Sequence, residues 1–463
     1  MSVQLMIILG YLGLTIWVGM FARRKSGSAK SFHGANLGVL MCVAAGTGEW
    51  LGGTSTTGIS EYGFAYGISG AWYTLANGIG VIVLALFFAK LYRSLDTVTI
   101  PGIIEKFIGQ DARVVSSILL TFVMIVVGTA QIIAAGTLGV SVLGMDFTLS
   151  VVVFGISFIV YTFFGGMRAV GYTNIIHLAA MYGGVILAII FVGKDIGGIE
   201  NLGQMLPAQP YYSMTDIGMP KVSSWVIASI LGACTAQAGI QPLLAAKDGA
   251  TAKKAAVITA FVVAPFGLLT ALLGMAARVK FPELENAKLA LPLLMMNFNP
   301  LVGGIVLAAI TAAILSTISP IILASGTMVT KDIYHCRINP LADDAKILWV
   351  SRVFTSLSGV VCIVLALAVY HAGARILDVV YFAYTIRGAL FVVLLFGIYW
   401  KKVTQPGAIT AMVLTSIAGV FWVVYKKIMG AYPIHPYFTE TYAALIVAGV
   451  STVLFSIFPK AGP

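Results

Sequence analysis

Residues 308–320 read Ala-Ala-Ile-Thr-Ala-Ala-Ile-Leu-Ser-Thr-Ile-Ser-Pro, and they lie inside an apolar run from 299 to 329. About 20 apolar residues are long enough to cross a bilayer as a helix. Ala313, Ser316 and Thr317 stand at positions i, i+3 and i+4, which places two hydroxyl groups on one face of that helix. The stretch therefore predicts a membrane helix with a polar spot near its centre.

This polar spot has two interpretations. Hydroxyl and carbonyl oxygens close together are suited to a hard monovalent cation. Pro320 has no N–H, so the carbonyl of Ser316, four residues earlier, loses its helical partner and is free to bind elsewhere. The alternative is structural: both hydroxyls bond to carbonyls of their own helix, and the proline only kinks it.

The same hydropathy pattern recurs along the whole chain. Of its 463 residues, 59% are hydrophobic and 10% are charged, and the mean hydropathy is +0.98. This composition excludes a soluble globule and a disordered chain, and four cysteines are too few for a disulfide scaffold. We expect an all-α integral membrane protein with about 13 transmembrane helices. The apolar runs are 3–22, 38–58, 67–91, 114–140, 147–166, 170–193, 223–243, 254–277, 299–329, 347–370, 376–400, 406–425 and 440–458.

The net charge of +11 follows the same organisation. Most Lys and Arg residues lie in alternate loops between the apolar runs and are not clustered on one face, which argues against nucleic-acid binding. Because cytoplasmic loops carry the excess of Lys and Arg, the pattern predicts a multi-pass protein of the cell membrane, with its amino terminus outside and its carboxyl terminus in the cytoplasm. The first run ends in Arg23, Arg24 and Lys25 rather than in a cleavage site, so we expect it to stay in the membrane.

Two runs contain residues that should interrupt their helices. These are residues 44–49 in the second run and Ser319-Pro320 in the ninth. Two interrupted helices far apart in sequence indicate the central site of a transporter. Glu49 is an acidic residue within the second run, where a charge is costly unless it is paired or neutralised. Arg387 either pairs with Glu49, in which case neither selects a solute, or meets a substrate carboxylate.

Four motifs occur in order over a large part of the chain. They are 161–169 (YTFFGGMRA), 241–248 (QPLLAAKD) with 252–255 (AKKA), 313–317 with 331–334 (KDIY), and 397–402 (GIYWKK) with 407–408. Together they resemble the sodium/solute symporter family. The resemblance implies one polytopic domain, 1–463, whose helices 2–11 form the five-plus-five inverted repeat of the leucine transporter. The repeats would span 38–193 and 223–400, with 3–22 as a peripheral first helix and 406–458 as two peripheral C-terminal helices.

The resemblance also implies a sodium ion between helices 2 and 9. The helix 9 motif falls on the carbonyl of Ala313 and the hydroxyls of Ser316 and Thr317. The helix 2 carbonyls are those of Cys42 and Ala45, with 46–48 as the broken stretch, or those of Val43 and Gly46 if the match shifts by one residue. Two departures from the family pattern are Asn174, where many members carry Asp, and Ala44 or Ala45, where others carry Asp or Asn. The candidate residues for solute binding are Thr47, Glu49, Trp50, Tyr161 and Arg387.

The function expected from these features is sodium-coupled symport of a small polar organic solute. The partners would be the sodium ion, the solute and the lipid bilayer; oligomeric state is not legible from the sequence. A proton-coupled symporter of the same fold is one alternative, with Glu49 or His177 carrying the proton. A sensor or channel-like module without coupled transport is another. An enzyme is not expected, because the sequence shows no clustered His, Cys and Asp and no nucleophile with a base at a suitable spacing.

Overall fold

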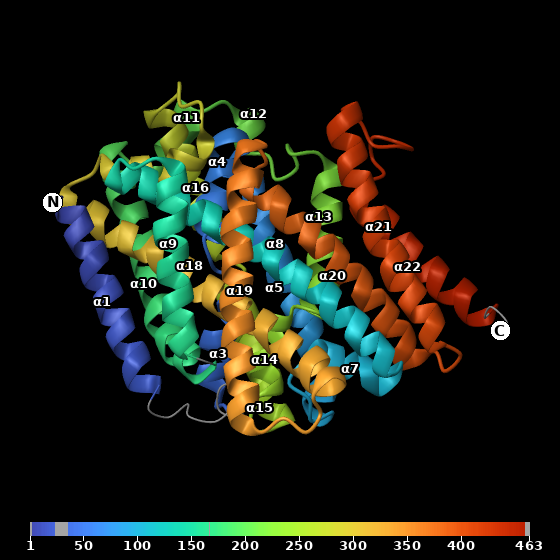
Figure 1. Cartoon of the computed structure of the whole chain (residues 1–463). Helices are drawn as coiled ribbons and strands as arrows, with labels where there is room; N and C mark the ends of the chain where they lie inside the picture. Colours follow the sequence, from blue (N-terminus) through green and yellow to red (C-terminus); the bar gives the residue numbers. More distant parts are fainter. Residues whose placement is uncertain (1, 24–35, 166, 459–463) are drawn as a thin grey trace.

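The structure is a computed structural model that describes residues 2–23, 36–165 and 167–458 (Figure 1). Regular structure in this part of the chain is helical, apart from one isolated β-bridge between Leu37 and Ala246. Helices satisfy their own backbone hydrogen bonds, as a membrane requires. The all-α membrane fold expected from the sequence is therefore confirmed.

The helices of the first half begin with the long α1. They are α1 Val3–Arg23, α3 Val39–Thr47, η1 Thr54–Gly58, α4 Ile59–Tyr66, η2 Gly67–Ala71, α5 Trp72–Val83, η3 Leu84–Phe88, α6 Ala89–Ser94, α7 Ile100–Phe107, α8 Gln110–Leu143, α9 Phe147–Gly165 and α10 Met167–Asp195.

The helices of the second half contain the polar stretch of 308–320 within α18. They are η4 Ile199–Asn201, α11 Leu202–Met205, α12 Ala208–Tyr211, α13 Met219–Ala233, α14 Gln237–Leu244, α15 Gly249–Val263, α16 Phe266–Lys280, η5 Ala287–Leu289, α17 Ala290–Met296, α18 Pro300–Met328, η6 Val329–Ile338, α19 Asp344–His371, α20 Ile376–Tyr399, α21 Gln405–Met429 and α22 Glu440–Ile457.

Ten helical segments within the described residues are long and apolar enough to cross a membrane. Shorter apolar helices occur at Val3–Val18, Phe147–Phe163 and Ala287–Met296. The expected number of 13 spans is not confirmed. Part of the difference lies in the second run, whose first helix, α3, has only nine residues before the backbone leaves helical form.

One helix interruption lies close to where the sequence places it. After α3 the backbone makes turns from Gly48 to Gly53 and then resumes as η1 and α4. The break therefore begins at the last residue of the expected 46–48 stretch and includes Glu49. Backbone of this kind is tolerated at membrane depth only where protein or a cavity surrounds it, and residues 48–53 are all buried.

The prediction of a second interruption at Ser319-Pro320 is wrong. Helix α18 continues through Pro320 to Met328. The carbonyl that the proline leaves unpaired, that of Ser316, accepts a hydrogen bond from Asn174 Nδ2 at 3.1 Å. A neighbouring helix thus satisfies the freed group, and the helix has no need to unwind.

The second interruption in fact separates α13 from α14, at residues 234–236. There the amides of Cys234 and Thr235 bond three residues back, to Leu231 and Gly232. The hydroxyl of Thr235 donates to the carbonyl of Arg387 in α20 at 2.6 Å. The interruptions after α3 and after α13 therefore lie in the first helices of the two predicted repeats.

Helix α18 occupies the centre of the bundle. It packs against α8, α10, α1 and α19, and nearly all its residues from Gly303 onward are buried. Helices α21 and α22 pack on each other and on α20 at the edge of the molecule (Figure 1). The hydroxyl face of α18 is thus directed at protein.

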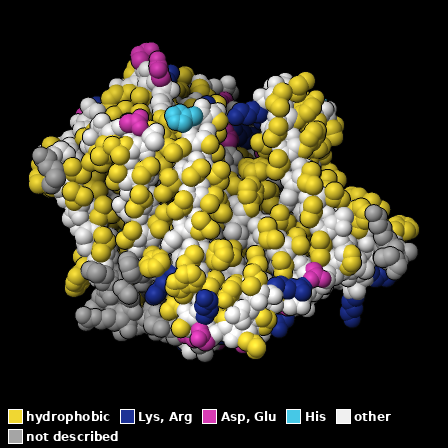
Figure 2. All heavy atoms as spheres, viewed as in Figure 1, with side chains coloured by type: hydrophobic (Ala, Val, Ile, Leu, Met, Phe, Trp, Pro, Cys, Tyr) yellow, Lys and Arg dark blue, Asp and Glu magenta, His cyan; other side chains and the backbone are white. Residues whose placement is uncertain are grey.

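The outer surface shows a hydrophobic band. On the face drawn in Figure 2, hydrophobic side chains cover the middle of the molecule, and Lys and Arg gather mainly toward the lower end. Helices α7 and α15 lie at this end (Figure 1). Helix α12 and the start of α13 lie at the other end.

Candidate functional site

The broken stretch Gly48–Gly53 lies directly against the hydroxyl face of α18. A side chain at Gly48 would collide with the carbonyl oxygen of Ser316, and one at Gly52 would collide with the hydroxyl of Thr317. Glycine is needed at these two positions because the backbone itself approaches the neighbouring helix. The structure therefore brings together the two features that the sequence singled out.

The oxygens at this contact are neutral. The hydroxyl of Ser316 donates to the carbonyl of Ala313 at 2.8 Å and lies 3.1 Å from the carbonyl of Leu51. The hydroxyl of Thr317 is completely buried and has no hydrogen-bond partner. A buried hydroxyl without a partner is unfavourable by about 1–3 kcal/mol, which makes it a candidate ligand group. The structural reading, in which both hydroxyls bond their own helix, fits Ser316 in part and does not fit Thr317.

Cys42 and Ala45 lie in α3, which packs against α10, α14 and α15. The thiol of Cys42 points to the carbonyl of Pro242, 3.2 Å away. The amide of Glu49, which would bond the carbonyl of Ala45 in a continuous helix, donates to Gly46 instead. The residues seen in contact with Ser316 and Thr317 lie further along the chain, at 48–52, so the ligand roles of Cys42 and Ala45 stay a prediction.

Gln131 of α8 supports the broken stretch from the other side. Its Oε1 accepts the amide of Gly53 at 2.7 Å, and its Nε2 lies 3.4 Å from the hydroxyl of Thr54. From there the hydroxyls of Thr54, Tyr73 and Tyr384 form a chain with steps of 3.0 Å. The sequence analysis did not select Gln131, although a buried amide in the middle of a 34-residue apolar helix was a usable signal.

Glu49 and Arg387 pair with each other. The distance from Arg387 Nη1 to Glu49 Oε1 is 2.6 Å, and neither side chain is exposed. The guanidinium carbon lies 3.6 Å from the centre of the Tyr384 ring, a cation–π contact. Of the two interpretations of Arg387, the structure shows the paired one. The pair also joins the two interruptions, since Glu49 lies in the first and Arg387 is bonded to the second through Thr235.

The other predicted solute residues are dispersed. The hydroxyl of Thr47 donates to the carbonyl of Val43 within its own helix. Trp50 is buried with its ring against Gly239, and its Nε1 has no partner. The hydroxyl of Tyr161 donates to Thr173 in α10 at 2.6 Å. Trp50 therefore lies at the break, whereas the hydroxyl of Tyr161 links α9 to α10 by a hydrogen bond.

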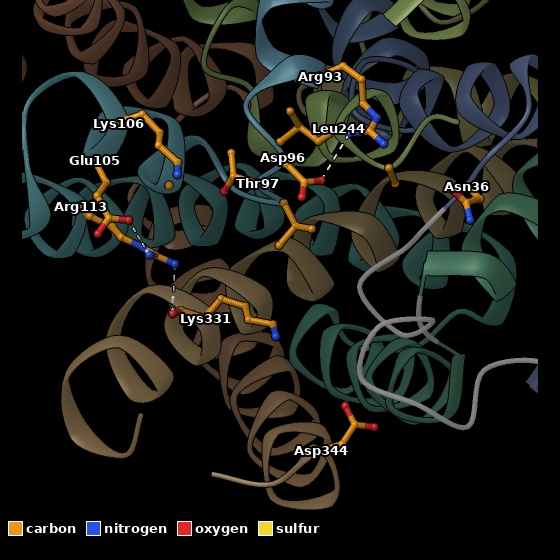
Figure 3. A pocket seen from close by; sticks show the side chains of 13 residues that line it. Asn36, Arg93, Asp96, Thr97, Glu105, Lys106, Arg113, Leu244, Lys331 and Asp344 are labelled. Atoms are coloured by element: carbon orange, nitrogen blue, oxygen red, sulfur yellow. Dashed lines mark hydrogen bonds and ion pairs between the residues drawn. The ribbon is translucent and has the colours of Figure 1, made fainter. Parts of the chain in front are cut away.

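A polar pocket of about 720 Å³ opens at the end of the molecule where α7 lies (Figure 3). Arg93 and Asp96 enter it from one side, and Lys331 and Asp344 from another. Its lining comprises Asn36, Arg93, Asp96, Thr97, Val98, Gly102, Glu105, Lys106, Arg113, Leu244, Ala245, Lys331 and Asp344.

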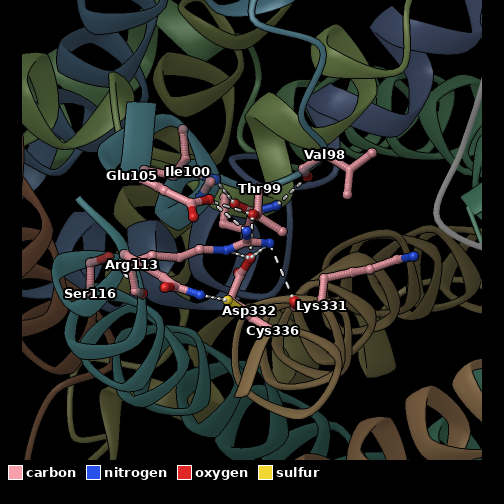
Figure 4. Close-up of polar contacts among 12 residues, drawn as sticks. Val98, Thr99, Ile100, Glu105, Arg113, Ser116, Lys331, Asp332 and Cys336 are labelled. Carbon is pink, nitrogen blue, oxygen red and sulfur yellow. Dashed lines mark hydrogen bonds and ion pairs between the residues drawn. The ribbon is translucent and has the colours of Figure 1, made fainter. Parts of the chain in front are cut away.

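An ion-pair network lies beside this pocket (Figure 4). Arg113 of α8 contacts Asp332 at 2.8 Å and Glu105 at 2.6 Å. Asp332, which is fully buried, also accepts the hydroxyl of Thr99 at 2.9 Å. In the same region Gln237 of α14 bonds to the backbone of Val98 and Ile100. These contacts tie α7 and α8 to α14 and η6.

The other end of the bundle carries a second network. Lys221 of α13 pairs with Asp378 of α20 at 2.9 Å, and Lys288 lies 3.6 Å from the buried Glu61. Glu61 also accepts the amide of Ile376 at 3.1 Å. A pocket of about 380 Å³ opens beside Lys221. The buried centre is thus bounded at each end by polar contacts between helices of the two halves.

Comparison with known proteins places the chain in a transporter family. Residues 32–415 match the model of the sodium:solute symporter family. The osmoregulated proline transporter OpuE of Bacillus subtilis is 26% identical, over 98% of this chain and 96% of that protein. The sodium/proline symporter of Escherichia coli is also 26% identical (96% and 91%), and the sodium/glucose cotransporter of Vibrio parahaemolyticus is 25% identical (89% and 83%).

Solved structures agree on the fold. A sodium-coupled sialic acid symporter in a substrate-bound, outward-open state superimposes with a TM-score of 0.81 at 18% identity, covering 99% of this chain and 98% of that chain. MhsT in complex with L-phenylalanine has a TM-score of 0.59 at 15% identity, covering 90% and 98%. The family model covers most of the sequence, and the architecture agrees with it. The chain therefore belongs to the sodium:solute symporter family, in which sodium is the coupling ion.

Proposed function

We propose that the protein imports a small polar organic solute by sodium-coupled symport with alternating access. The observation that carries this proposal is the contact between the broken stretch Gly48–Gly53 and the hydroxyls of Ser316 and Thr317. A sodium ion bound there joins two helices that are otherwise held by few polar contacts. The ion thereby favours one arrangement of the bundle, and a ligand shifts a population only through such a difference in affinity.

The proposed ligands are the carbonyl of Ala313 and the hydroxyls of Ser316 and Thr317 from α18, with carbonyls of Cys42 and Ala45 from α3. Thr47, Glu49, Trp50, Tyr161 and Arg387 are the proposed solute residues. Burial beside the first interruption supports this role for Trp50. Glu49 and Arg387 bond to each other, which favours a structural role for this pair. The relatives named above transport proline and glucose, so the family alone leaves the solute open.

The driving force follows from elementary electrostatics. One positive charge entering a cell gains about 2.3 kcal/mol per 100 mV of membrane potential. This alone concentrates a neutral solute about fifty-fold, since 1.4 kcal/mol is a factor of ten. We place the amino terminus outside and the basic loops in the cytoplasm, in agreement with the gathering of Lys and Arg at one end of Figure 2. The Arg113–Asp332 contact then lies at the inner end of the bundle and the Lys221–Asp378 contact at the outer end.

Uptake into membrane vesicles tests the proposal. With sodium replaced by choline at fixed pH, uptake should fall to background. Undiminished uptake would favour the proton-coupled alternative, and an absence of solute accumulation in either buffer would favour a sensor or channel-like module. The double variant Ser316→Ala plus Thr317→Ala should lose sodium activation, whereas Thr311→Val in the same helix should keep it, because Thr311 only bonds Leu307 of its own helix.

A further inference from the structure

Two apolar hollows lie on the outer surface of the bundle, where α20 and α22 pack side by side at the edge of the molecule (Figure 1). One has a volume of about 430 Å³ and the other about 340 Å³, and they adjoin at Phe396, which lines both. We call them together the α20–α22 groove. The end of α20 contributes Phe396, Tyr399 and Trp400 to its lining, and α22 contributes Ile446, Val450 and Leu454. None of these residues is charged, so the groove suits a hydrocarbon chain.

Gly449 keeps the α20–α22 groove open. It lies on the α22 side of the lining, and the atom nearest to a Cβ at this position would be Cε2 of Phe396, at 4.0 Å. The neighbouring side chains of Ile446, Val450 and Leu454 are each about half exposed. A larger side chain at 449 would therefore fill the groove without a clash against the backbone.

The groove has about the length of one leaflet of the bilayer. From Ile446 to Leu454 the α22 axis advances about 12 Å at 1.5 Å per residue. Half of the hydrocarbon core of a bilayer measures about 15 Å. At the end of the groove lie Tyr399 and Trp400, residue types that gather at the membrane surface. The ring of Trp400 packs edge-on against Phe396, with the ring centres 5.8 Å apart. The groove thus runs from the bilayer interior to one surface.

A pair of positive charges follows at this surface. Lys401 and Lys402 come directly after the last aromatic residue of the groove, and both are exposed. The one acidic residue between positions 391 and 458 is Glu440, at the opposite end of α22. Asp111 of the neighbouring α8 is already paired with Arg337. These acids therefore leave the charge of the lysine pair uncompensated, and an anion is its matching partner.

We propose that the α20–α22 groove binds an anionic phospholipid, with one acyl chain along α22 and the phosphate at Lys401 and Lys402. The lysines supply the selectivity, because lipid tails are as apolar as leucine and apolar contact alone favours no particular lipid. In the orientation proposed above, this end faces the cytoplasm, whose leaflet carries the anionic lipids. A second copy of the chain is a poorer occupant, because two-fold packing about an axis normal to the membrane brings the two lysine pairs together.

Thermal unfolding of the purified protein in a neutral detergent tests the proposal, since a ligand that binds only the folded state raises the melting point. The probes are phosphatidylglycerol and phosphatidylcholine with identical acyl chains. Phosphatidylglycerol should stabilise the protein at about 30-fold lower concentration, which corresponds to about 1 kcal/mol for each lysine. Native mass spectrometry should show phosphatidylglycerol retained on the protein.

Variants locate the binding. The double variant Lys401→Gln plus Lys402→Gln should lose the preference for phosphatidylglycerol. Lys426→Gln plus Lys427→Gln is the matched control, because this exposed pair lies at the end of α21, outside the groove, and it should keep the preference.

A second pair of variants tests the groove itself. Gly449→Leu fills it and should weaken the binding of both lipids. Gly183→Leu, at a position that also has open space around it, should bind them like the wild type. If Gly449→Leu does not fold, the exposed lysine variants decide the outcome.

Three results would overturn the proposal. The first is equal stabilisation by the two lipids. The second is a preference that survives in the Lys401→Gln plus Lys402→Gln variant or disappears equally in its control. The third is a dimer that Gly449→Leu dissociates in the absence of lipid, which would assign the groove to a second copy of the chain. Stabilisation by sodium should be the same in all four variants, so failure of the lipid proposal leaves sodium symport standing.

Discussion

The hydroxyl of Thr317 permits a sharp experiment, because it is fully buried and has no hydrogen-bond partner within the protein. Thr317→Val removes this hydroxyl and keeps the shape of the side chain. In sodium-free buffer no hydrogen bond is lost, so the variant should be as stable as the wild type or more stable by up to about 1–3 kcal/mol, the cost of burying an unpaired hydroxyl.

When sodium is present, the wild type should instead be more stable than Thr317→Val. The loss of a hydrogen bond to a charged group, about 1.5–3 kcal/mol, is a guide to the loss of one ligand oxygen. This corresponds to about 10-fold to about 100-fold weaker sodium binding. Sodium titrations of the melting point in choline-balanced buffer measure both effects in one experiment. The expected result is a variant that is at least as stable without sodium and less stabilised by it.

Two controls sharpen the interpretation. Thr311→Val, in the same helix, loses a hydrogen bond to Leu307 and should be less stable at every sodium concentration with unchanged sodium affinity. Ser316→Ala loses its bonds to Ala313 and Leu51 and should be less stable even without sodium. If Thr317→Val keeps the wild-type sodium affinity, the hydroxyl face of α18 does not bind the ion and the reasoning fails.

Three further predictions concern the surroundings of the site. Gln131→Leu leaves a buried backbone amide of the broken stretch without its acceptor, and we expect a loss of about 1–3 kcal/mol in a denaturation experiment; an unchanged stability would contradict this. Gly48→Ala should abolish sodium-dependent uptake because its Cβ meets the α18 backbone, whereas Gly183→Ala, with open space around it, should transport normally. Asp332→Asn should weaken the inner network and increase alkylation of the buried Cys42, as measured by peptide mass spectrometry; equal labelling in both proteins would count against a closing role for this network.

The sequence predicted the local features of the site well. The interval of three and four residues between Ala313, Ser316 and Thr317 is a property of helical geometry, and the structure keeps all three on one buried helix. The pairing of Glu49 with Arg387 was one of two predicted interpretations, because a buried charge must find a partner or be neutralised. The interruption near Glu49 was also predicted, with its position two residues too early.

The errors have a common physical origin. Pro320 removes a hydrogen bond from its own helix, and the sequence pattern cannot show that Asn174, more than 100 residues away, replaces it. The real second interruption, at 234–236, has no proline; the bond from Thr235 to Arg387 in another helix holds it. The role of Gln131 depends in the same way on a backbone amide 78 residues distant.

The amino-acid sequence by itself therefore determined the membrane fold, the family, the helix that carries the hydroxyls and the presence of opposite charges in the bundle. These depend on hydropathy, helical period and motif order, which are local properties of the chain. The tertiary structure decided which carbonyl regains a partner, which helix breaks, and which polar atoms stay unbonded at the centre. These features depend on contacts between helices that are distant in sequence. Because the contacts are buried away from water, each one has a large effect on stability.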